Sequence, residues 1–420
     1  MILGVIADDF TGGTDIATVL ARDGLRVVQA IGVPPMDRDF GEVDALVIAL
    51  KTRSIPALQA CAISLEALEA LRARGAERVY FKYCSTFDST DRGNIGPVAE
   101  ALATRLGAKM AIFCPAYPEN HRRVFGGYLF VGDVLLSESG MRDHPVTPMR
   151  DANLVRVLAR QTTRAVDRVD LNAVRAGPRT VAARLRELRE GGIFHAIVDA
   201  TRDADFETIA AALGDDVLAT GGAPFAGGFA TRRRARGFTP ADDAQRALPA
   251  VGGPAVVIAG SCSRATLAQV ALSRTAMPTF ALDERVFTQT DDVVSSALAW
   301  ADAQSKDGPI MVTASEAPEA VSEHHERYGA DEASRSVEDA LARIASGLRE
   351  RGIRRFIVAG GETSGATVRA LGVDALRIGP QIEPGVPWTV TVDAQPIALA
   401  LKSGNFGSED FFARALATAP

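Results

Sequence analysis

The sequence predicts an α/β protein of two domains, each built on a central, largely parallel sheet flanked by helices. Short β-branched runs alternate with Ala- and Leu-rich helical stretches in the first half of the chain, and the alternation restarts after residue 254. The length of 420 residues supports two domains, because single hydrophobic cores stop growing near ~250–300 residues.

The first domain is expected to span residues 1–228. Residues 56–72 begin with Pro and repeat Leu58, Leu65, Leu68 and Leu71, a spacing that places one apolar stripe against a sheet. A second helix is expected near Thr180–Arg189. The expected strands are Leu3–Asp8, Val27–Ile31, Ala45–Leu50, Val79–Lys82, Met110–Phe113, Arg164–Val169, Ala196–Asp199 and Val217–Ala219.

A change of composition marks residues 229–253 as the linker. The surrounding stretch, Gly221–Pro254, is rich in Gly, Pro and charged residues and has little apolar periodicity. The second domain is then expected over residues 254–420. Its predicted elements are strands at Ala255–Ala259, Ile310–Thr313 and Arg355–Ala359 and helices at Ser336–Glu350 and near Glu409–Leu416.

Charge and composition exclude several classes of function. The net charge of −6 argues against a nucleic-acid partner, since phosphate backbones are bound by clustered Lys and Arg. No apolar run approaches the roughly 20 residues that span a bilayer, and acids stand where a secretory segment needs bases. A cytoplasmic protein without a membrane partner is expected. The sequence does not decide whether the chain forms a homo-oligomer.

The sequence gives little support for a zinc site or for disulfide bonds. The four cysteines, Cys61, Cys84, Cys114 and Cys262, form no C-x-x-C pair, so neither a disulfide framework nor a zinc site is suggested. The five histidines show no H-E-x-x-H spacing, which argues against a zinc hydrolase.

Two turns of the second domain have the form strand, small polar or glycine-rich turn, then helix. They are Gly260–Ser263, with Ser261, and Gly360–Ala366. The free N–H groups and dipole of such a helix start favour a phosphate. Ser and Thr are also ordinary N-caps, so one such turn alone is more often structural, but two in one domain favour a nucleotide site.

A third loop, Leu401–Gly407, follows an apolar run and contains Lys402 and Gly404. Lys402 is a candidate partner for a phosphate, with an exposed lysine in an ordinary turn as the alternative. The P-loop, H-R-D and D-F-G signatures are all missing from the sequence. Any ATP must therefore bind in a different way.

In the first domain, acids follow the first strand. Asp8, Asp9 and Asp15 lie beside Thr11 and Thr14, and ligands of open α/β sheets bind outside the carboxyl ends of strands. This cluster is suited to a polyhydroxy substrate or to Mg²⁺. Helix capping by Asp8 or Thr11 is the alternative, although it does not account for all three acids.

Cations follow two other strands of this domain. Lys51 and Arg53 end one strand, and Lys82 ends another, ahead of Ser85 and Asp88. Cations at the ends of apolar strands are costly unless they are exposed or paired, so a bound carboxylate is a sensible partner. Solvated strand termini are the alternative.

Together these motifs resemble the four-carbon acid sugar kinase family. The resemblance rests on residues 4–15, on the Gly-Ser-Cys-Ser and Gly-Gly-Glu-Thr-Ser-Gly-Ala turns, and on Leu-Lys-Ser-Gly-Asn-Phe-Gly. Residues 82–90, 94–98, 114–120 and 144–149 are most similar to its 3-oxo-tetronate kinase subgroup. One departure is Gly13, where many members carry Ala.

The resemblance implies ATP-dependent phosphorylation of the terminal (C4) hydroxyl of 3-oxo-tetronate, with the sugar acid held by the first domain and ATP by the second. Phosphoryl transfer also needs Mg²⁺, whose ligands the sequence does not single out. The ATP contacts implied by the family are Ser261, Gly361, Glu362, Thr363, Ser364 and Gly404.

For the acceptor we expect Lys51, Arg53 and Lys82 to hold the substrate carboxylate and carbonyl, with Asp15, Ser85 and Asp88 also binding substrate. Asp8 or Asp9 is expected to orient or deprotonate the attacking hydroxyl. Two alternatives stay open at this stage. One is a D-threonate or D-erythronate kinase, and the other is a non-enzymatic nucleotide or sugar-acid sensor.

Overall fold

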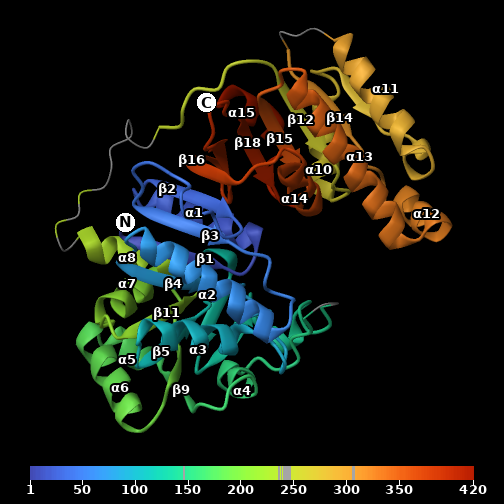
Figure 1. Cartoon of the computed structure of the whole chain (residues 1–420). Helices are drawn as coiled ribbons and strands as arrows, with labels where there is room; N and C mark the ends of the chain where they lie inside the picture. Colours follow the sequence, from blue (N-terminus) through green and yellow to red (C-terminus); the bar gives the residue numbers. More distant parts are fainter. Residues whose placement is uncertain (145–146, 235–236, 238, 240–246, 305–307) are drawn as a thin grey trace. The chain divides into compact units, whose positions relative to one another are not determined.

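The computed structural model describes residues 1–144, 147–234, 237, 239, 247–304 and 308–420. These residues form two compact units, an N-terminal unit over Met1–Arg246 and a C-terminal unit over Ala247–Pro420. Each unit is a sheet flanked by helices (Figure 1). The predicted α/β class is therefore confirmed.

The sheet of the N-terminal unit is entirely parallel, in the order β2-β3-β1-β4-β11-β5-β10-β9. Strands β1, β3 and β5 of this sheet are apolar and buried along their whole length, as expected where helices cover both faces. The strands are β1 (Leu3–Ala7), β2 (Val27–Ile31), β3 (Ala45–Ala49), β4 (Arg78–Lys82), β5 (Met110–Cys114), β9 (Val166–Val169), β10 (His195–Val198) and β11 (Val217–Gly221).

Helices cover both faces of this sheet. Helix α1 (Phe10–Arg22) packs with α8 (Ala223–Arg234), which packs with α7 (Asp203–Ala212), while α2 (Ala57–Ala73) packs with α3 (Ile95–Leu106) (Figure 1). The strand and helix ranges predicted for this unit agree with these elements to within a few residues. The remaining helices are α4 (Leu154–Ala159), α5 (Leu171–Arg175) and α6 (Pro178–Glu190).

A small antiparallel sheet in this unit was not predicted. It consists of β6 (Arg122–Phe125), β7 (Tyr128–Val131) and β8 (Val134–Leu135). These strands have two to four residues and are only partly buried. Such short strands carry too little apolar alternation to be recognised in a sequence.

Helix α8 enters the range that the sequence suggested as linker. Its residues Phe229 and Ala230, inside the predicted linker 229–253, are buried in the N-terminal unit. Residues 235–236, 238 and 240–246 of that range lie outside the described residues, as do residues 145–146 of the motif at 144–149.

The C-terminal unit has a mixed sheet in the order β13-β14-β12-β15-β18-β17-β16. The neighbouring strands β13, β14, β12, β15 and β18 pair in parallel. Strand β17 is antiparallel to both β18 and β16. The antiparallel edge was not predicted. The strands are β12 (Ala255–Ala259), β13 (Thr279–Ala281), β14 (Ile310–Thr313), β15 (Arg355–Ala359), β16 (Ala375–Glu383), β17 (Val386–Thr391) and β18 (Ala398–Lys402).

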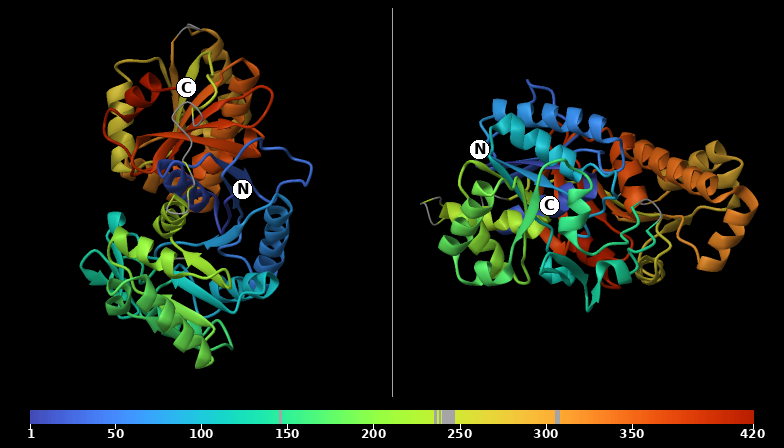
Figure 2. Two further views of the ribbon diagram at one scale, coloured as in Figure 1. Left: turned by 90° about the vertical axis from the view of Figure 1, so that its left-hand side faces the viewer. Right: turned by 90° about the horizontal axis from the view of Figure 1, so that it is seen from below.

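Helices lie on both sides of this second sheet, as the left view of Figure 2 shows. Helix α13 (Ala330–Glu350) packs against α11 (Thr290–Asp302), α12 (Pro318–Tyr328) and α14 (Gly361–Ala370), and α10 (Arg264–Ser273) packs against α15 (Phe411–Ala417). The core beneath α10 and α15 includes Val257, Trp388 and Phe412, all buried. None of the described helices has the length and apolar character needed to cross a bilayer.

Candidate active site

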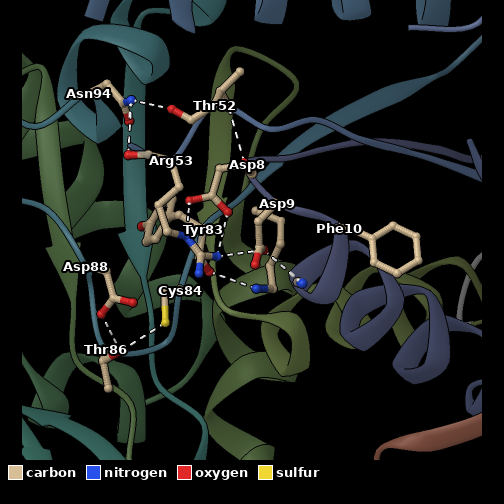
Figure 3. Close-up of polar contacts among 12 residues, drawn as sticks. Asp8, Asp9, Phe10, Thr52, Arg53, Tyr83, Cys84, Thr86, Asp88 and Asn94 are labelled. Atoms are coloured by element: carbon tan, nitrogen blue, oxygen red, sulfur yellow. Dashed lines mark hydrogen bonds and ion pairs between the residues drawn. The ribbon is translucent and has the colours of Figure 1, made fainter. Parts of the chain in front are cut away.

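The carboxyl ends of β1 and β3 are joined through Asp8 and Arg53. Arg53 donates from Nε to Asp8 Oδ2 at 3.0 Å and from Nη2 to Asp8 Oδ1 at 2.8 Å (Figure 3). The backbone N–H groups of Thr52 and Arg53 also donate to the Asp8 carbonyl. Because Asp8 is buried, this two-pronged ion pair fixes both strand ends.

Asp9 is the second acid in contact with Arg53. Its Oδ1 accepts from Arg53 Nη2 at 2.7 Å and from the N–H of Gly12 at 2.8 Å, which makes it the N-cap of α1 (Figure 3). Burial raises the pKa of Asp9 and the neighbouring Asp8 adds to the rise, while Arg53 and Lys82 oppose it. The carboxylate is therefore more basic than an exposed aspartate.

Lys82 and Asp15 form the next part of the cluster. Lys82 is buried at the end of β4, and its Nζ donates to the Tyr83 carbonyl at 2.9 Å. Asp15, one turn into α1, accepts from the Tyr117 hydroxyl at 3.1 Å. Burial raises the pKa of Asp15, while the positive charge of Lys82 opposes that rise.

The loop after β4 supplies Ser85 and Asp88. Arg122 at the start of β6 donates from Nη1 to Ser85 Oγ at 3.0 Å. Thr86 links Asp88 to the Cys84 thiol, with its hydroxyl 2.5 Å from Asp88 Oδ1 and 2.9 Å from Cys84 Sγ (Figure 3). Burial raises the pKa of Cys84 to about 11, which disfavours the thiolate that a nucleophilic cysteine needs.

Asn94 holds the backbone of the segment that carries Arg53. Its Nδ2 donates to the carbonyls of Thr52, at 2.7 Å, and Arg53, at 3.4 Å (Figure 3). It also donates to the Ile55 carbonyl, at 3.1 Å. Lys51 differs from the other predicted residues, because its side chain is exposed. Among the residues that the structure describes, no hydrogen bond or ion pair joins the Lys51 side chain to Asp8, Asp9 or Arg53.

In the C-terminal unit, three loops lie together at the carboxyl ends of β12, β15 and β18. The N–H of Ser261 donates to the Ala359 carbonyl at 3.1 Å, and that of Gly360 donates to the Lys402 carbonyl at 3.0 Å. Gly360 precedes α14 with a φ of 133°, a backbone conformation that glycine tolerates. Helix α14 therefore starts with its free N–H groups at the same edge as Ser261.

Lys402 lies behind the third loop. The buried Nζ donates to Thr266 Oγ1 and to the Gly404 carbonyl, both at 3.0 Å, and to the Ser403 carbonyl at 3.2 Å. Ser263 Oγ also donates to the Gly404 carbonyl, at 2.6 Å. Burial lowers the pKa of Lys402 to about 8. In this structure Lys402 holds the loop in place.

A cavity of about 300 Å³ opens beside the first two loops. Its apolar wall includes Phe287, which lies against the His324 ring with 4.7 Å between centroids. His324 Nδ1 lies 3.1 Å from Glu316 Oε2. Four of the predicted ATP contacts line this cavity, namely Ser261, Gly361, Glu362 and Thr363.

Two domain families match the chain. The model of a sugar-binding N-terminal domain matches residues 3–229, and that of a nucleotide-binding C-terminal domain matches residues 256–412. A 3-oxo-tetronate kinase of Cupriavidus necator is 52% identical over 99% of this chain and 96% of its own length. One from Burkholderia multivorans is 50% identical with the same coverage.

The chain belongs to the four-carbon acid sugar kinase family, in its 3-oxo-tetronate kinase group. Two solved structures from bacteria agree with this assignment in fold. A Salmonella typhimurium protein has a TM-score of 0.92 and 43% identity, covering 100% of this chain and 99% of its own. A Haemophilus influenzae protein has a TM-score of 0.88 and 42% identity, covering 99% of both chains.

For this member of the family, the structure gathers most of the residues predicted from the sequence. Asp8, Asp9 and Arg53 are in direct contact, and Lys82 is close enough to influence the pKa of both Asp9 and Asp15. Ser364 lies one turn into α14, with its hydroxyl buried and unpaired among the described residues.

Three contributors were missed, namely Tyr117, Arg122 and Asn94. Tyr117 and Arg122 flank a turn between β5 and β6, and Asn94 precedes α3. Residues 94–98 and 114–120 belong to the motifs that carry the family resemblance. However, nothing in their spacing indicates that Tyr117 meets Asp15 or that Arg122 meets Ser85.

Proposed function

We propose that this chain is an ATP-dependent kinase that phosphorylates the terminal (C4) hydroxyl of 3-oxo-tetronate, giving 3-oxo-tetronate 4-phosphate. The observation that carries this proposal is about 50% identity, over nearly the whole chain, to several 3-oxo-tetronate kinases. The sugar acid binds to the N-terminal unit and the nucleotide to the C-terminal unit.

On the acceptor side, Asp9 is the better candidate for the base. Asp8 receives both prongs of Arg53, so its oxygens are largely committed to holding that side chain. Asp9 shares a single Arg53 nitrogen and has a raised pKa. A carboxylate of this kind can orient the C4 hydroxyl and accept its proton during transfer.

On the nucleotide side, the N-terminus of α14 and the Ser261 and Gly404 loops receive the phosphates. The adjacent cavity, with Phe287 on its apolar wall, is suited to the flat face of the base. Mg²⁺ would bind with the ATP phosphates and one or two carboxylates. Glu362, which lines the cavity beside Gly361, is a suitable carboxylate.

The test is an assay of the pure protein with Mg-ATP and a panel of four-carbon acids. The panel contains 3-oxo-tetronate, D-threonate and D-erythronate. We expect ADP release and a 4-phosphate product, identified by mass and NMR, with the highest kcat/KM for 3-oxo-tetronate. A preference for either aldonate would change the substrate assignment. ATP binding without turnover of any acid would favour a sensor.

A further inference from the structure

The two best-placed cations of the acceptor cluster already have acidic neighbours. Arg53 is engaged by Asp8 through two nitrogens and by Asp9 through one of them. The charge of Lys82 acts on both Asp9 and Asp15. A substrate carboxylate that approached Arg53 would meet the two carboxylates that already pair with it, and Lys82 acts on Asp15 more strongly than Arg122 does. A cation that is less engaged by these acids is therefore better suited to anchor the acid group of the substrate.

Arg122 is a cation of this kind. Its side chain donates from Nη1 to the neutral Ser85 hydroxyl, at 3.0 Å. Its Nε is buried and has no hydrogen-bond partner among the residues that the structure describes. Nε and Nη2 form the same edge of the guanidinium that Arg53 uses to bind Asp8. A buried, unpaired donor on an arginine calls for an acceptor.

The backbone explains how Arg122 reaches the cluster. Tyr117 and Arg122 exchange two backbone hydrogen bonds, N to O at 2.8 Å and 3.0 Å, across a tight turn that ends at His121 with φ 56°. From this turn the Tyr117 hydroxyl meets Asp15 and the Arg122 guanidinium meets Ser85. The charge of Arg122 also opposes the rise in the pKa of Asp15.

We propose that Arg122 binds the carboxylate of the acid substrate through its Nε and Nη2 edge, and so makes the enzyme selective for sugar acids over uncharged sugars. The inference rests on the proposed kinase function. A planar guanidinium matches a carboxylate in a two-pronged geometry that lysine does not reproduce. Substrate binding would supply the acceptor that the buried Nε lacks.

The experiment compares the wild type with Arg122→Gln, Arg122→Lys and the neighbouring control Arg123→Gln. Alternation along β6 directs the side chain of Arg123 to the opposite face. Each protein is assayed with 3-oxo-tetronate and with the uncharged four-carbon ketose that carries a hydroxymethyl group in place of the carboxylate. Thermal melting of each variant checks that it is folded.

For Arg122→Gln we expect KM for the acid to rise about 100-fold, as for loss of a buried charged contact, with kcat and KM for ATP within about threefold. In Arg122→Lys the KM for the acid should rise about tenfold. In Arg123→Gln it should equal the wild-type value. KM for the ketose should be the same in all four proteins, so the preference for the acid should largely disappear in Arg122→Gln.

Two results would overturn the inference. One is an unchanged KM for the acid in the folded Arg122→Gln and Arg122→Lys proteins. The other is an equal loss of activity with the ketose, which would indicate a structural role for Arg122. If Arg122→Gln does not fold, Arg122→Lys tests the inference through the same two measurements, the KM for the acid and the activity with the ketose. A wild type that phosphorylates no acid would instead contradict the proposed function.

Discussion

The guanidinium of Arg53 donates two hydrogen bonds to the carboxylate of Asp8, at 3.0 Å and 2.8 Å. Only 3% of the Asp8 side chain and 25% of the Arg53 side chain are exposed. The pair therefore joins the ends of β1 and β3 in a largely dry environment. Both oxygens of Asp8 are therefore engaged by Arg53, which supports the proposal that Asp9 rather than Asp8 acts on the hydroxyl.

Replacing Asp8 with Ala should destabilise the protein strongly. The change leaves the Arg53 charge partly buried with Asp9 alone, and breaking such a pair costs about 3 kcal/mol of unfolding free energy. The double variant Asp8→Ala, Arg53→Met should recover part of that loss, because the unpaired charge is gone. Urea unfolding of the single and double variants measures the coupling. Strictly additive losses would contradict the interaction.

Replacing Asp9 with Asn should mainly reduce kcat, by about 10²–10⁴-fold for a lost general base. Asn is as good an N-cap as Asp, so the melting temperature should change little. Because burial raises the pKa of Asp9 above 3.8, wild-type kcat/KM should fall as pH drops through that raised value. The acid limb should be absent in the variant. Full activity in the folded variant would remove Asp9 as the base.

Asp15→Asn should stabilise the folded protein at pH 7 and weaken substrate binding. Burial raises the pKa of Asp15 above its ordinary 3.8, so stability from this group is fully present below pH 3.8 and is lost as pH rises through the folded-state pKa. The neutral variant should therefore be more stable than the wild type at pH 7, and the gain should vanish in acid. Urea unfolding at several pH values checks the sign.

The same variant should bind the acid substrate about tenfold more weakly, the loss expected from one hydrogen bond that involves a charged group. Tyr117→Phe is the matched variant, since it removes only the hydroxyl that donates to Asp15. If Asp15→Asn is instead less stable than the wild type at pH 7, then Lys82, Tyr117 and Arg122 stabilise the Asp15 carboxylate by more than its burial destabilises it. That result would contradict the prediction.

Lys402→Met should raise KM for ATP by about tenfold or more, because the Gly404 loop loses a buried donor to two carbonyls and a hydroxyl. With the pKa of Lys402 lowered to about 8, the wild-type KM for ATP should itself rise as pH increases through 8 and the ammonium loses a proton. Lys109→Met, at an exposed residue just before β5, is the control. A flat pH profile for KM would contradict the role of the charge.

Gly361→Ala tests how closely a phosphate approaches α14. Among the residues that the structure describes, a Cβ at Gly361 meets no atom within 4 Å, and one at Gly365 meets only Arg369 Nη1, at 3.5 Å. Both Ala variants should therefore fold with equal or slightly higher stability. KM for ATP should rise at least tenfold for Gly361→Ala and stay unchanged for Gly365→Ala. Equal values in both variants would place the phosphates elsewhere.

The order of strands and helices could largely be predicted from the sequence because several parallel strands are buried on both faces and form continuous apolar runs, as at Ala45–Ala49 and Ala255–Ala259. The positions of Asp8, Arg53 and Lys82 followed from the same logic, since parallel strands end at one edge. The short strands β6 to β8 and the antiparallel β16 and β17 lacked such a signal.

By itself, the sequence determined the α/β class, the three glycine-containing loops and the acids and cations at the strand ends, because these depend on local patterns. Only the tertiary structure decided which of these groups neutralise one another. Arg53 is committed to Asp8, Lys402 supports its own loop, and Arg122 meets Ser85 from a turn 37 residues away. Such pairings depend on contacts between distant segments, and no local periodicity encodes them.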